Sequence, residues 1–205
     1  MAARTNAADP IHVVAFGDSL TAGYGLPATE GFVPRLQAAL AGTGVDATVA
    51  NAGVSGDTAA DGLARLDWSV PQGTDAVIVE LGANDMLRGI DPAATGRTLD
   101  EILGRLAARH IAVMLCGMRA APNLGPDYGK AFDGIYPALA TKYGAGLYPF
   151  FLDGVAGDLK LVQADGLHPN AAGVDAIVRR ILPAVMELIA RAKARQSPEG
   201  LRGRS

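Results

Sequence analysis

The 205-residue sequence has little of what three classes of protein need. Its single cysteine, Cys116, excludes an intrachain disulfide and any metal site built on two cysteines. It has no basic excess, because 18 Lys and Arg residues face 21 Asp and Glu residues, and this balance argues against non-specific binding of nucleic acid. The longest stretch without a charge, Ser19 to Thr29, has 11 residues, well short of a membrane-spanning helix. We expect neither a nucleic-acid partner nor an integral membrane segment.

The start of the chain also lacks an apolar run. Residues 1–10 therefore contain no signal peptide as printed, and we expect them to be flexible. A periplasmic or secreted location follows if a leader was removed, and a cytoplasmic one if the chain is complete. The remaining composition, 49% hydrophobic and 19% charged, suits one ordinary domain, expected over residues 11–190. Residues 191–205 are rich in basic side chains and are expected to be a frayed tail. The oligomeric state has no signal in the sequence.

Short apolar runs alternate with helical patterns along the chain. Such alternation, with nearly continuous apolar strands, predicts an α/β fold in which helices cover both faces of a parallel sheet. We expect a single-domain, three-layer αβα architecture with a five-stranded sheet in the flavodoxin-like order 2-1-3-4-5. The strands are expected at Val13–Phe16, Ala47–Ala50, Ala76–Leu81, Ile111–Cys116 and Leu147–Pro149.

Helix boundaries are indicated by capping residues. Asp57 can cap a helix that carries leucines, Asp91 followed by proline is a strong helix start, and Asn170 can cap the last helix. Pro183 is expected to kink or split that last helix, because proline removes a hydrogen bond from a helix interior.

Polar motifs follow the predicted strands. In a doubly wound sheet, ligands bind beyond the carboxyl ends of the strands, so these motifs are expected to meet there. They are Gly17-Asp18-Ser19-Leu20, Asn51-Ala52-Gly53, Gly82-Ala83-Asn84-Asp85 and, before the last helix, Asp165-Gly166-Leu167-His168.

Ser19 and His168 are the candidate nucleophile and base. A serine hydroxyl needs an adjacent base at neutral pH, and an imidazole can accept and return its proton. Asp165, three residues before His168, can present a carboxylate to the ring and fix its tautomer. Taken alone, Ser19 is more often a helix cap or a turn residue, and an isolated Asp-x-x-His is more often the start of a helix.

Gly53 and Asn84 are the candidate oxyanion donors, together with the Ser19 N–H group. A glycine N–H can approach a ligand closely, and Asn84 offers a side-chain amide at the end of the strongest strand. Each is separately more typical of a turn. The four motifs together nevertheless supply a nucleophile, a base, an orienting carboxylate and oxyanion donors, which is the set that acyl transfer requires.

The combination resembles the SGNH (GDSL) hydrolases, whose motif residues correspond to Ser19, Gly53, Asn84 and His168, with Asp165 completing the triad. Further stretches resemble the bacterial thioesterase I/protease I/lysophospholipase L1 and arylesterase subgroup, over roughly Val13 to Val185. They include Val54-Ser55-Gly56-Asp57-Thr58, Gly62-Leu63-Ala64-Arg65-Leu66, Val79-Glu80-Leu81-Gly82, Leu87-Arg88-Gly89, Ile135-Tyr136-Pro137 and Pro149-Phe150-Phe151.

The resemblance implies a serine esterase that acts on small carboxylic esters through an acyl-enzyme, with thioesters or lysophospholipid as further substrates. It implies no metal and no cofactor. Two alternatives remain open at this point. One is a carbohydrate O-deacetylase with the same site, and the other is a flavodoxin-like module that binds phosphate or flavin.

Two further features need the structure. The loop after the fourth strand is expected to set acyl selectivity, with Met118, Leu124 and Tyr128 as the wall of an acyl groove. Glu80 lies within the third predicted strand, where a buried carboxyl group is unusual, and the sequence gives no reason for it.

Overall fold

The computed structural model describes residues 9–196, and its centre is a five-stranded sheet. The strand order is β2-β1-β3-β4-β5, with every neighbouring pair parallel, as predicted from the sequence. The strands are β1 (Ile11–Gly17), β2 (Ala47–Gly53), β3 (Ala76–Glu80), β4 (Ala112–Cys116) and β5 (Gly146–Tyr148).

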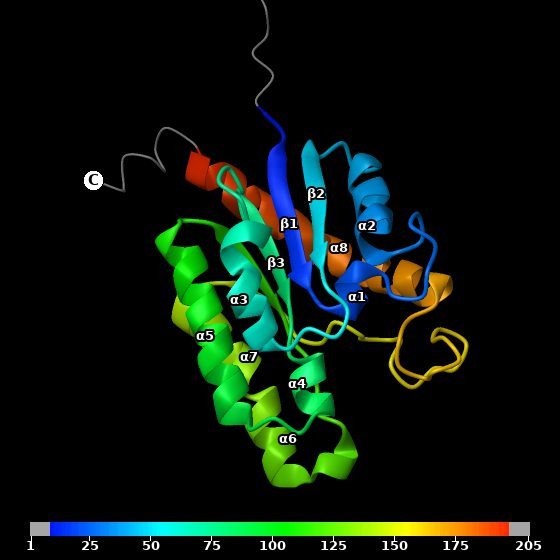
Figure 1. Cartoon of the computed structure of the whole chain (residues 1–205). Helices are drawn as coiled ribbons and strands as arrows, with labels where there is room; N and C mark the ends of the chain where they lie inside the picture. Colours follow the sequence, from blue (N-terminus) through cyan, green and yellow to red (C-terminus); the bar gives the residue numbers. More distant parts are fainter. Residues whose placement is uncertain (1–8, 197–205) are drawn as a thin grey trace, which may run out of the picture.

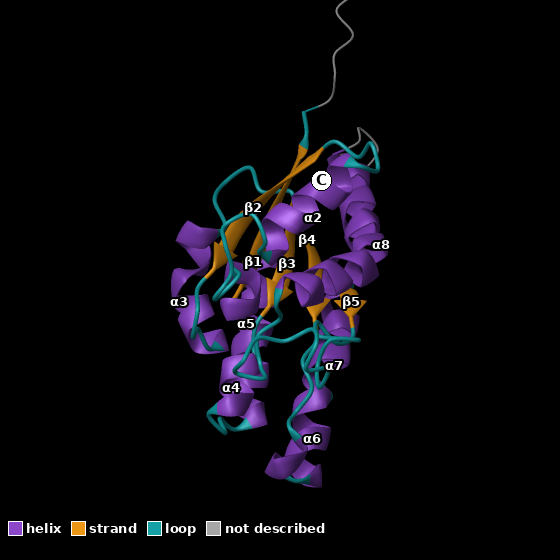
Figure 2. Ribbon diagram, turned by 90° about the vertical axis from the view of Figure 1, so that its right-hand side faces the viewer, coloured by secondary structure: helices purple, strands orange, loops and turns teal. Residues whose placement is uncertain are grey.

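Helices cover both faces of this sheet, which gives the predicted three-layer architecture (Figures 1 and 2). α3 and α5 pack on one face, while α2 and α8 pack together on the other. The helices are α1 (Ser19–Ala22), α2 (Phe32–Ala41), α3 (Ala59–Ser69), α4 (Ala83–Leu87), α5 (Pro92–Ala108), α6 (Pro126–Asp133), α7 (Ile135–Tyr143) and α8 (Ala171–Gln196), with a 3-10 turn, η1, at Pro122–Leu124.

The strand register fixes where the polar motifs meet. Gly17, at the end of β1, lies opposite Gly53 on β2 and opposite Glu80 on β3. The three strands therefore end level, and the chain turns there into α1, into the loop before α3 and into α4. Strands β3 and β4 are buried along their whole length, so the sheet is a rigid support for these turns.

Two helix caps follow the prediction and one does not. Asp91 accepts a hydrogen bond from Ala93 N–H at the start of α5, and Asn170 accepts one from Gly173 N–H at the start of α8. Helix α3, however, is capped by Thr58 and not by Asp57, because Thr58 and Asp61 form a reciprocal capping box. The Asp57 side chain is thereby free for another role.

The last helix is longer than predicted. It is not split at Pro183, because Ile181, Val185 and Leu188 are buried on either side and packing maintains the helix. It also continues to Gln196, six residues into the expected frayed tail, where Gln196 Nε2 donates to Asp75 Oδ1 at 2.6 Å. The rest of the expected tail, 197–205, and most of the expected flexible start, 1–8, lie outside the described residues.

No helix within residues 9–196 has the length and hydropathy to cross a membrane.

Candidate active site

Ser19, His168 and Asp165 form one continuous chain of hydrogen bonds. His168 Nε2 lies 2.9 Å from Ser19 Oγ, and His168 Nδ1 lies 2.7 Å from Asp165 Oδ2. The two imidazole nitrogens thus face opposite partners, so the carboxylate determines which nitrogen is free to accept the serine proton. The structure brings together the three residues predicted to act as nucleophile, base and orienting group.

Ser19 owes its position to the tight turn after β1. Asp18 caps the short helix α1 by accepting a hydrogen bond from Leu20 N–H at 3.0 Å, and Ser19 is the first residue of that helix. The helix ends after one turn at Gly23, which adopts the left-handed conformation with φ of 81°. The serine hydroxyl is therefore presented at the carboxyl edge of the sheet rather than inside a helix.

Asp165 is held by the loop that carries His168. Its Oδ1 accepts hydrogen bonds from the backbone N–H groups of His168 and Leu167, at 3.0 and 2.9 Å. These two backbone donors, helped by the His168 ring, lower the pKa of Asp165 to about 2. The carboxylate stays ionised and fixed, as an orienting group must. On the other side of the ring, Tyr24 lies with its centroid 4.6 Å from that of His168.

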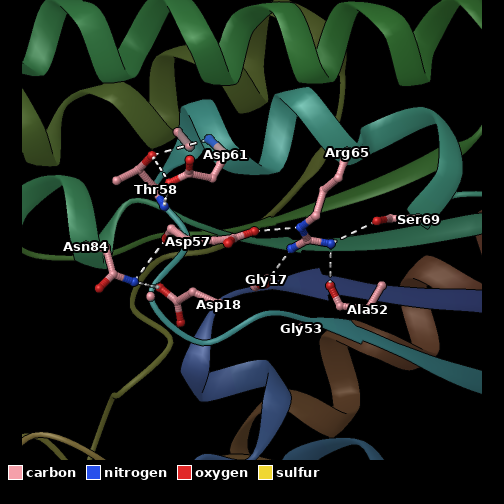
Figure 3. A network of polar contacts seen from close by, with 12 residues as sticks. Gly17, Asp18, Ala52, Gly53, Asp57, Thr58, Asp61, Arg65, Ser69 and Asn84 are labelled. Carbon is pink, nitrogen blue, oxygen red and sulfur yellow. Dashed lines mark hydrogen bonds and ion pairs between the residues drawn. The ribbon is translucent and has the colours of Figure 1, made fainter.

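Asn84 is positioned by two acceptors on different elements. Its Nδ2 donates to Asp18 Oδ2 at 3.1 Å and to the Asp57 backbone carbonyl at 2.9 Å. Figure 3 shows the amide nitrogen directed between these two groups. The side chain predicted to be an oxyanion donor is thus tied to the residue that directly precedes Ser19.

Gly53 occupies a different environment from the one predicted. Its N–H donates to Asn51 Oδ1 at 2.9 Å, so it already has a partner within the chain. A side chain at this position would collide with the Ala22 backbone in α1, which explains the glycine by packing. Three residues further on, the Gly56 N–H makes no hydrogen bond within the described chain, and Gly56 adjoins Asp57, whose carbonyl holds Asn84. The prediction did not include Gly56.

Arg65 is a residue that the sequence reasoning missed. Its Nε lies 2.6 Å from Asp57 Oδ2, and its two other nitrogens donate to the carbonyls of Gly17 and Ala52, at 2.8 and 2.9 Å. The guanidinium also packs 4.5 Å from the centre of the Phe16 ring. As Figure 3 shows, it thereby joins the ends of β1 and β2 to the loop that holds Asn84. A lone arginine on a predicted helix gave no signal of this.

The three residues of the predicted acyl groove differ in their exposure and surroundings. Met118 is 5% exposed and belongs to the same hydrophobic core as the residues of β4. Its side chain therefore offers little surface to an acyl chain. Leu124 and Tyr128 are partly buried against the core. Tyr128 lies in the first turn of α6, and its Oη donates to the Ile90 carbonyl at 2.8 Å, which ties α6 to the loop after α4.

No group of three or more His, Cys, Asp or Glu side chains that could hold a metal ion occurs within the described part of the chain.

Comparisons with known proteins identify the family of this chain. The profile of the GDSL-like Lipase/Acylhydrolase family matches residues 15–176. The protein named esterase TesA from Pseudomonas aeruginosa is 41% identical over 174 residues, which are 84% of this chain and 87% of the relative. The thioesterase 1/protease 1/lysophospholipase L1 of Escherichia coli strain K12 is 39% identical over 168 residues, which are 82% of this chain and 78% of that one.

Solved structures agree. A crystal structure of TesA superposes with a TM-score of 0.82 at 39% identity, covering 86% of this chain and 99% of that one. The structure of AlinE4, described as an SGNH-hydrolase family esterase, gives a TM-score of 0.75 at 48% identity, covering 88% and 97%. The chain belongs to the GDSL-like lipase/acylhydrolase family, the SGNH hydrolases.

Proposed function

We propose that the protein hydrolyses carboxylic esters with Ser19 as nucleophile, His168 as general base and Asp165 as the group that orients His168. The observation that carries this proposal is the hydrogen-bonded chain from Ser19 Oγ through both imidazole nitrogens to Asp165. Each distance lies in the range required for proton transfer between positioned groups. A phosphate- or flavin-binding module would need neither His168 nor Asp165, so the hydrogen bonds that join Ser19, His168 and Asp165 argue against that alternative.

In the first half of the reaction, Ser19 Oγ attacks the acyl carbonyl carbon while its proton passes to His168 Nε2. The tetrahedral intermediate then collapses, and the proton moves from Nε2 to the leaving alcohol or thiol. In the second half, a water molecule gives a proton to Nε2 and its oxygen attacks the acyl-enzyme. The carboxylic acid leaves as the proton returns to Ser19 Oγ.

The negative charge on the intermediate requires fixed donors. The Ser19 N–H, at the start of α1, and Asn84 Nδ2 are the first two. To reach the oxyanion, Asn84 Nδ2 keeps its contact with Asp18 and exchanges the Asp57 carbonyl for the substrate oxygen. For the third we assign the Gly56 N–H in place of the predicted Gly53 N–H. The reason is that Gly53 is already bonded to Asn51, whereas Gly56 is unbonded among the described residues and lies beside the carbonyl that holds Asn84.

The substrates follow from the relatives and from the loop after β4. Proteins named esterase, arylesterase and thioesterase, each about 40% identical to this chain, support aryl and short-to-medium acyl esters, with acyl thioesters as a second class. We further assign Leu124 and Tyr128, on the rim next to α4, to the contact with the acyl chain.

The test of the mechanism is labelling with a fluorophosphonate, which reacts with activated serines. The probe should modify Ser19, and Ser19→Ala should abolish both the labelling and the hydrolysis of p-nitrophenyl esters. Ser55→Ala, which removes the exposed serine nearest to Gly56 in the sequence, is the matched control and should label as the wild type does. Full activity in Ser19→Ala would refute the mechanism. Comparing aryl esters, acyl thioesters and acetylated sugars then separates an esterase from a carbohydrate deacetylase.

A further inference from the structure

A buried carboxyl group lies directly behind the nucleophile and has no part in the reaction above. Glu80 is the last residue of β3 and is 1% exposed. The ionisable groups that act on it or respond to it are Asp18, Cys116 and Tyr136, and none of these is a cation. A carboxylate buried without a cation is costly, so this position calls for an explanation.

The contacts of Glu80 are divided between its two oxygens. Oε2 accepts hydrogen bonds from Thr21 Oγ1 at 2.8 Å and from the Asp18 backbone N–H at 3.4 Å. Oε1 is buried, and no donor among the described residues reaches it. An oxygen that has no donor in a buried site is the natural position for a proton of its own.

The neighbouring acidic group is the Asp18 carboxyl, which is 0% exposed and whose own backbone N–H lies 3.4 Å from Glu80 Oε2. Asp18 needs its negative charge, because it accepts from Leu20 N–H and from Asn84 Nδ2. Gly17 leaves the space in which Thr21 reaches Glu80. A side chain at this position would collide with the Thr21 hydroxyl and the Glu80 carboxyl group.

The pKa shifts of Glu80 and Asp18 agree with a proton on Glu80 and a negative charge on Asp18. Burial, and then the neighbouring Asp18, raise the pKa of Glu80 well above its ordinary value. Burial also raises the pKa of Asp18, but hydrogen bonds to Leu20, Glu80 and Asn84 and the nearby His168 limit the rise to about 6. Both shifts favour a retained proton, and the geometry places it on Glu80, because Asp18 already accepts two hydrogen bonds whereas Glu80 Oε1 has no donor among the described residues.

We propose that Glu80 is a positioning residue, which in its protonated form donates a hydrogen bond to the Asp18 carboxylate and so holds Asn84 at the oxyanion position. The order of contacts is Thr21 to Glu80, Glu80 to Asp18, and Asn84 to Asp18. Glu80 touches no reacting atom and acts only through the other two residues. This inference rests on the proposed function for its effect on rate, but its protonation and its contact with Asp18 are independent of any reaction.

The protonation is tested by infrared difference spectroscopy of wild type against Glu80→Gln at neutral pH, without substrate. The spectrum should contain the carbonyl stretching band of a protonated carboxyl group that the variant lacks. An ionised-carboxylate band in its place would overturn the proposal, whatever reaction the protein catalyses. The side-chain amide resonances of Asn84, followed by NMR in the same samples, should stay unchanged in Glu80→Gln, because the glutamine amide can donate to Asp18 as the acid does.

The functional arm compares a conservative and an apolar variant. Glu80→Gln should keep kcat within about threefold of the wild type, whereas Glu80→Leu should lower kcat by about 10–100-fold with little change in KM, because Asn84 loses its fixed partner. Introduced into Asn84→Ala, Glu80→Leu should lower kcat no further. An equal additional loss in that background would show that Glu80 does not act through Asn84.

Thr95→Val is the matched control for the loss of a buried hydrogen bond. Thr95 is 1% exposed and donates to Asp85 at 3.0 Å, and neither residue forms a hydrogen bond with Glu80 or Asp18 within the described chain. It should lower the melting temperature without changing kcat. If Glu80→Leu does not fold, the infrared band and the activity of Glu80→Gln still decide the question, because loss of kcat in Glu80→Gln would contradict the proposal.

Discussion

His168 Nε2 reaches Ser19 Oγ at 2.9 Å across 149 positions of sequence. Ser19 follows the interior strand β1, and His168 lies in the loop that leads into α8, the helix that packs against β1 and β4. The contact therefore depends on docking of the last helix against the sheet. Proton transfer is possible only in the complete fold, because no local segment contains both groups.

The first prediction concerns Asp165. Its pKa of about 2, caused by the backbone donors of His168 and Leu167, means that it carries its charge over the whole range in which an esterase is assayed. Asp165→Asn should therefore lower kcat/KM at every pH from about 5 to 9, by an amount that approaches 10³–10⁴-fold, because the amide cannot fix the required tautomer. Measurement of kcat/KM across this range checks it. Recovery of activity at one end of the range would show that Asp165 has a different task.

The second prediction concerns Asn84. Asn84→Ala should lower kcat by about 10²–10³-fold with little change in KM, because the oxyanion exists only in the transition state and in the intermediate. Steady-state kinetics with one p-nitrophenyl ester are sufficient. A change in KM alone would make Asn84 a substrate-binding residue.

The third prediction separates the two glycines. Asn51→Ala removes the acceptor from the Gly53 N–H and leaves Gly56 as it is. If Gly56 supplies the third donor, kcat should stay within about twofold of the wild type, since no group that faces the oxyanion has changed. A clear rise in kcat would indicate that Asn51 had been competing for a Gly53 donor, and would restore Gly53 to the oxyanion hole.

The sheet and the positions of Ser19, His168 and Asp165 could be predicted because their signals are local. β-branched apolar runs such as Ala76–Glu80 indicate buried parallel strands, and strand ends in such a sheet point to the ligand edge. Ser19, Asn84 and the pair Asp165 and His168 each lie at such an edge or at the helix entry next to it. Their meeting follows from the topology alone.

The residues that support them could not be predicted, because their roles are defined by partners far away in sequence. Arg65 meets Gly17 across 48 positions, and the hydrogen bond from Thr21 to Glu80 spans 59. A single arginine on a helix or a glutamate in a strand has no pattern that names its partner. The choice between Gly53 and Gly56 depended on a side-chain acceptor, Asn51, that occupies one of the two N–H groups.

The fourth prediction concerns the effect of the raised pKa of Glu80 on the stability of the protein at different pH values. In the unfolded chain Glu80 ionises near its ordinary pKa of 4.5, whereas burial keeps it protonated in the folded protein. A group whose pKa is raised by folding contributes stability below its unfolded pKa and loses it as the pH rises toward the folded pKa. Glu80→Gln has no such proton. As the pH rises from 4.5 to 7, its free energy of unfolding should therefore increase relative to that of the wild type.

The size of this gain follows from linkage, at about 1.4 kcal/mol for each unit by which folding raises the pKa within that range. Urea unfolding at pH 4.5 and at pH 7 measures it. The exposed Glu101, paired with Arg105 on α5, provides the control, because Glu101→Gln should leave the difference between the two pH values close to that of the wild type. If the change in unfolding free energy between pH 4.5 and pH 7 is also the same in Glu80→Gln as in the wild type, Glu80 ionises in the folded protein.

The last prediction concerns acyl selectivity. Leu124 is partly buried in the turn η1, and Tyr128, in the first turn of α6, donates to the Ile90 carbonyl in the loop after α4. If an acyl chain lies along this rim, each methylene buried there contributes up to about 0.8 kcal/mol, so a few carbons change preference more than tenfold. Leu124→Ala should therefore reduce kcat/KM for octanoyl esters far more than for acetyl esters of the same leaving group.

Tyr128→Phe removes only the hydrogen bond to Ile90 and should loosen the rim, with a smaller loss confined to the longer chains. Met118→Leu, which changes a core side chain of similar volume, is the control and should leave the chain-length profile unchanged. Equal losses for acetyl, butyryl and octanoyl esters in Leu124→Ala would make the loop a structural connection, because a group that contacts the acyl chain must distinguish its length.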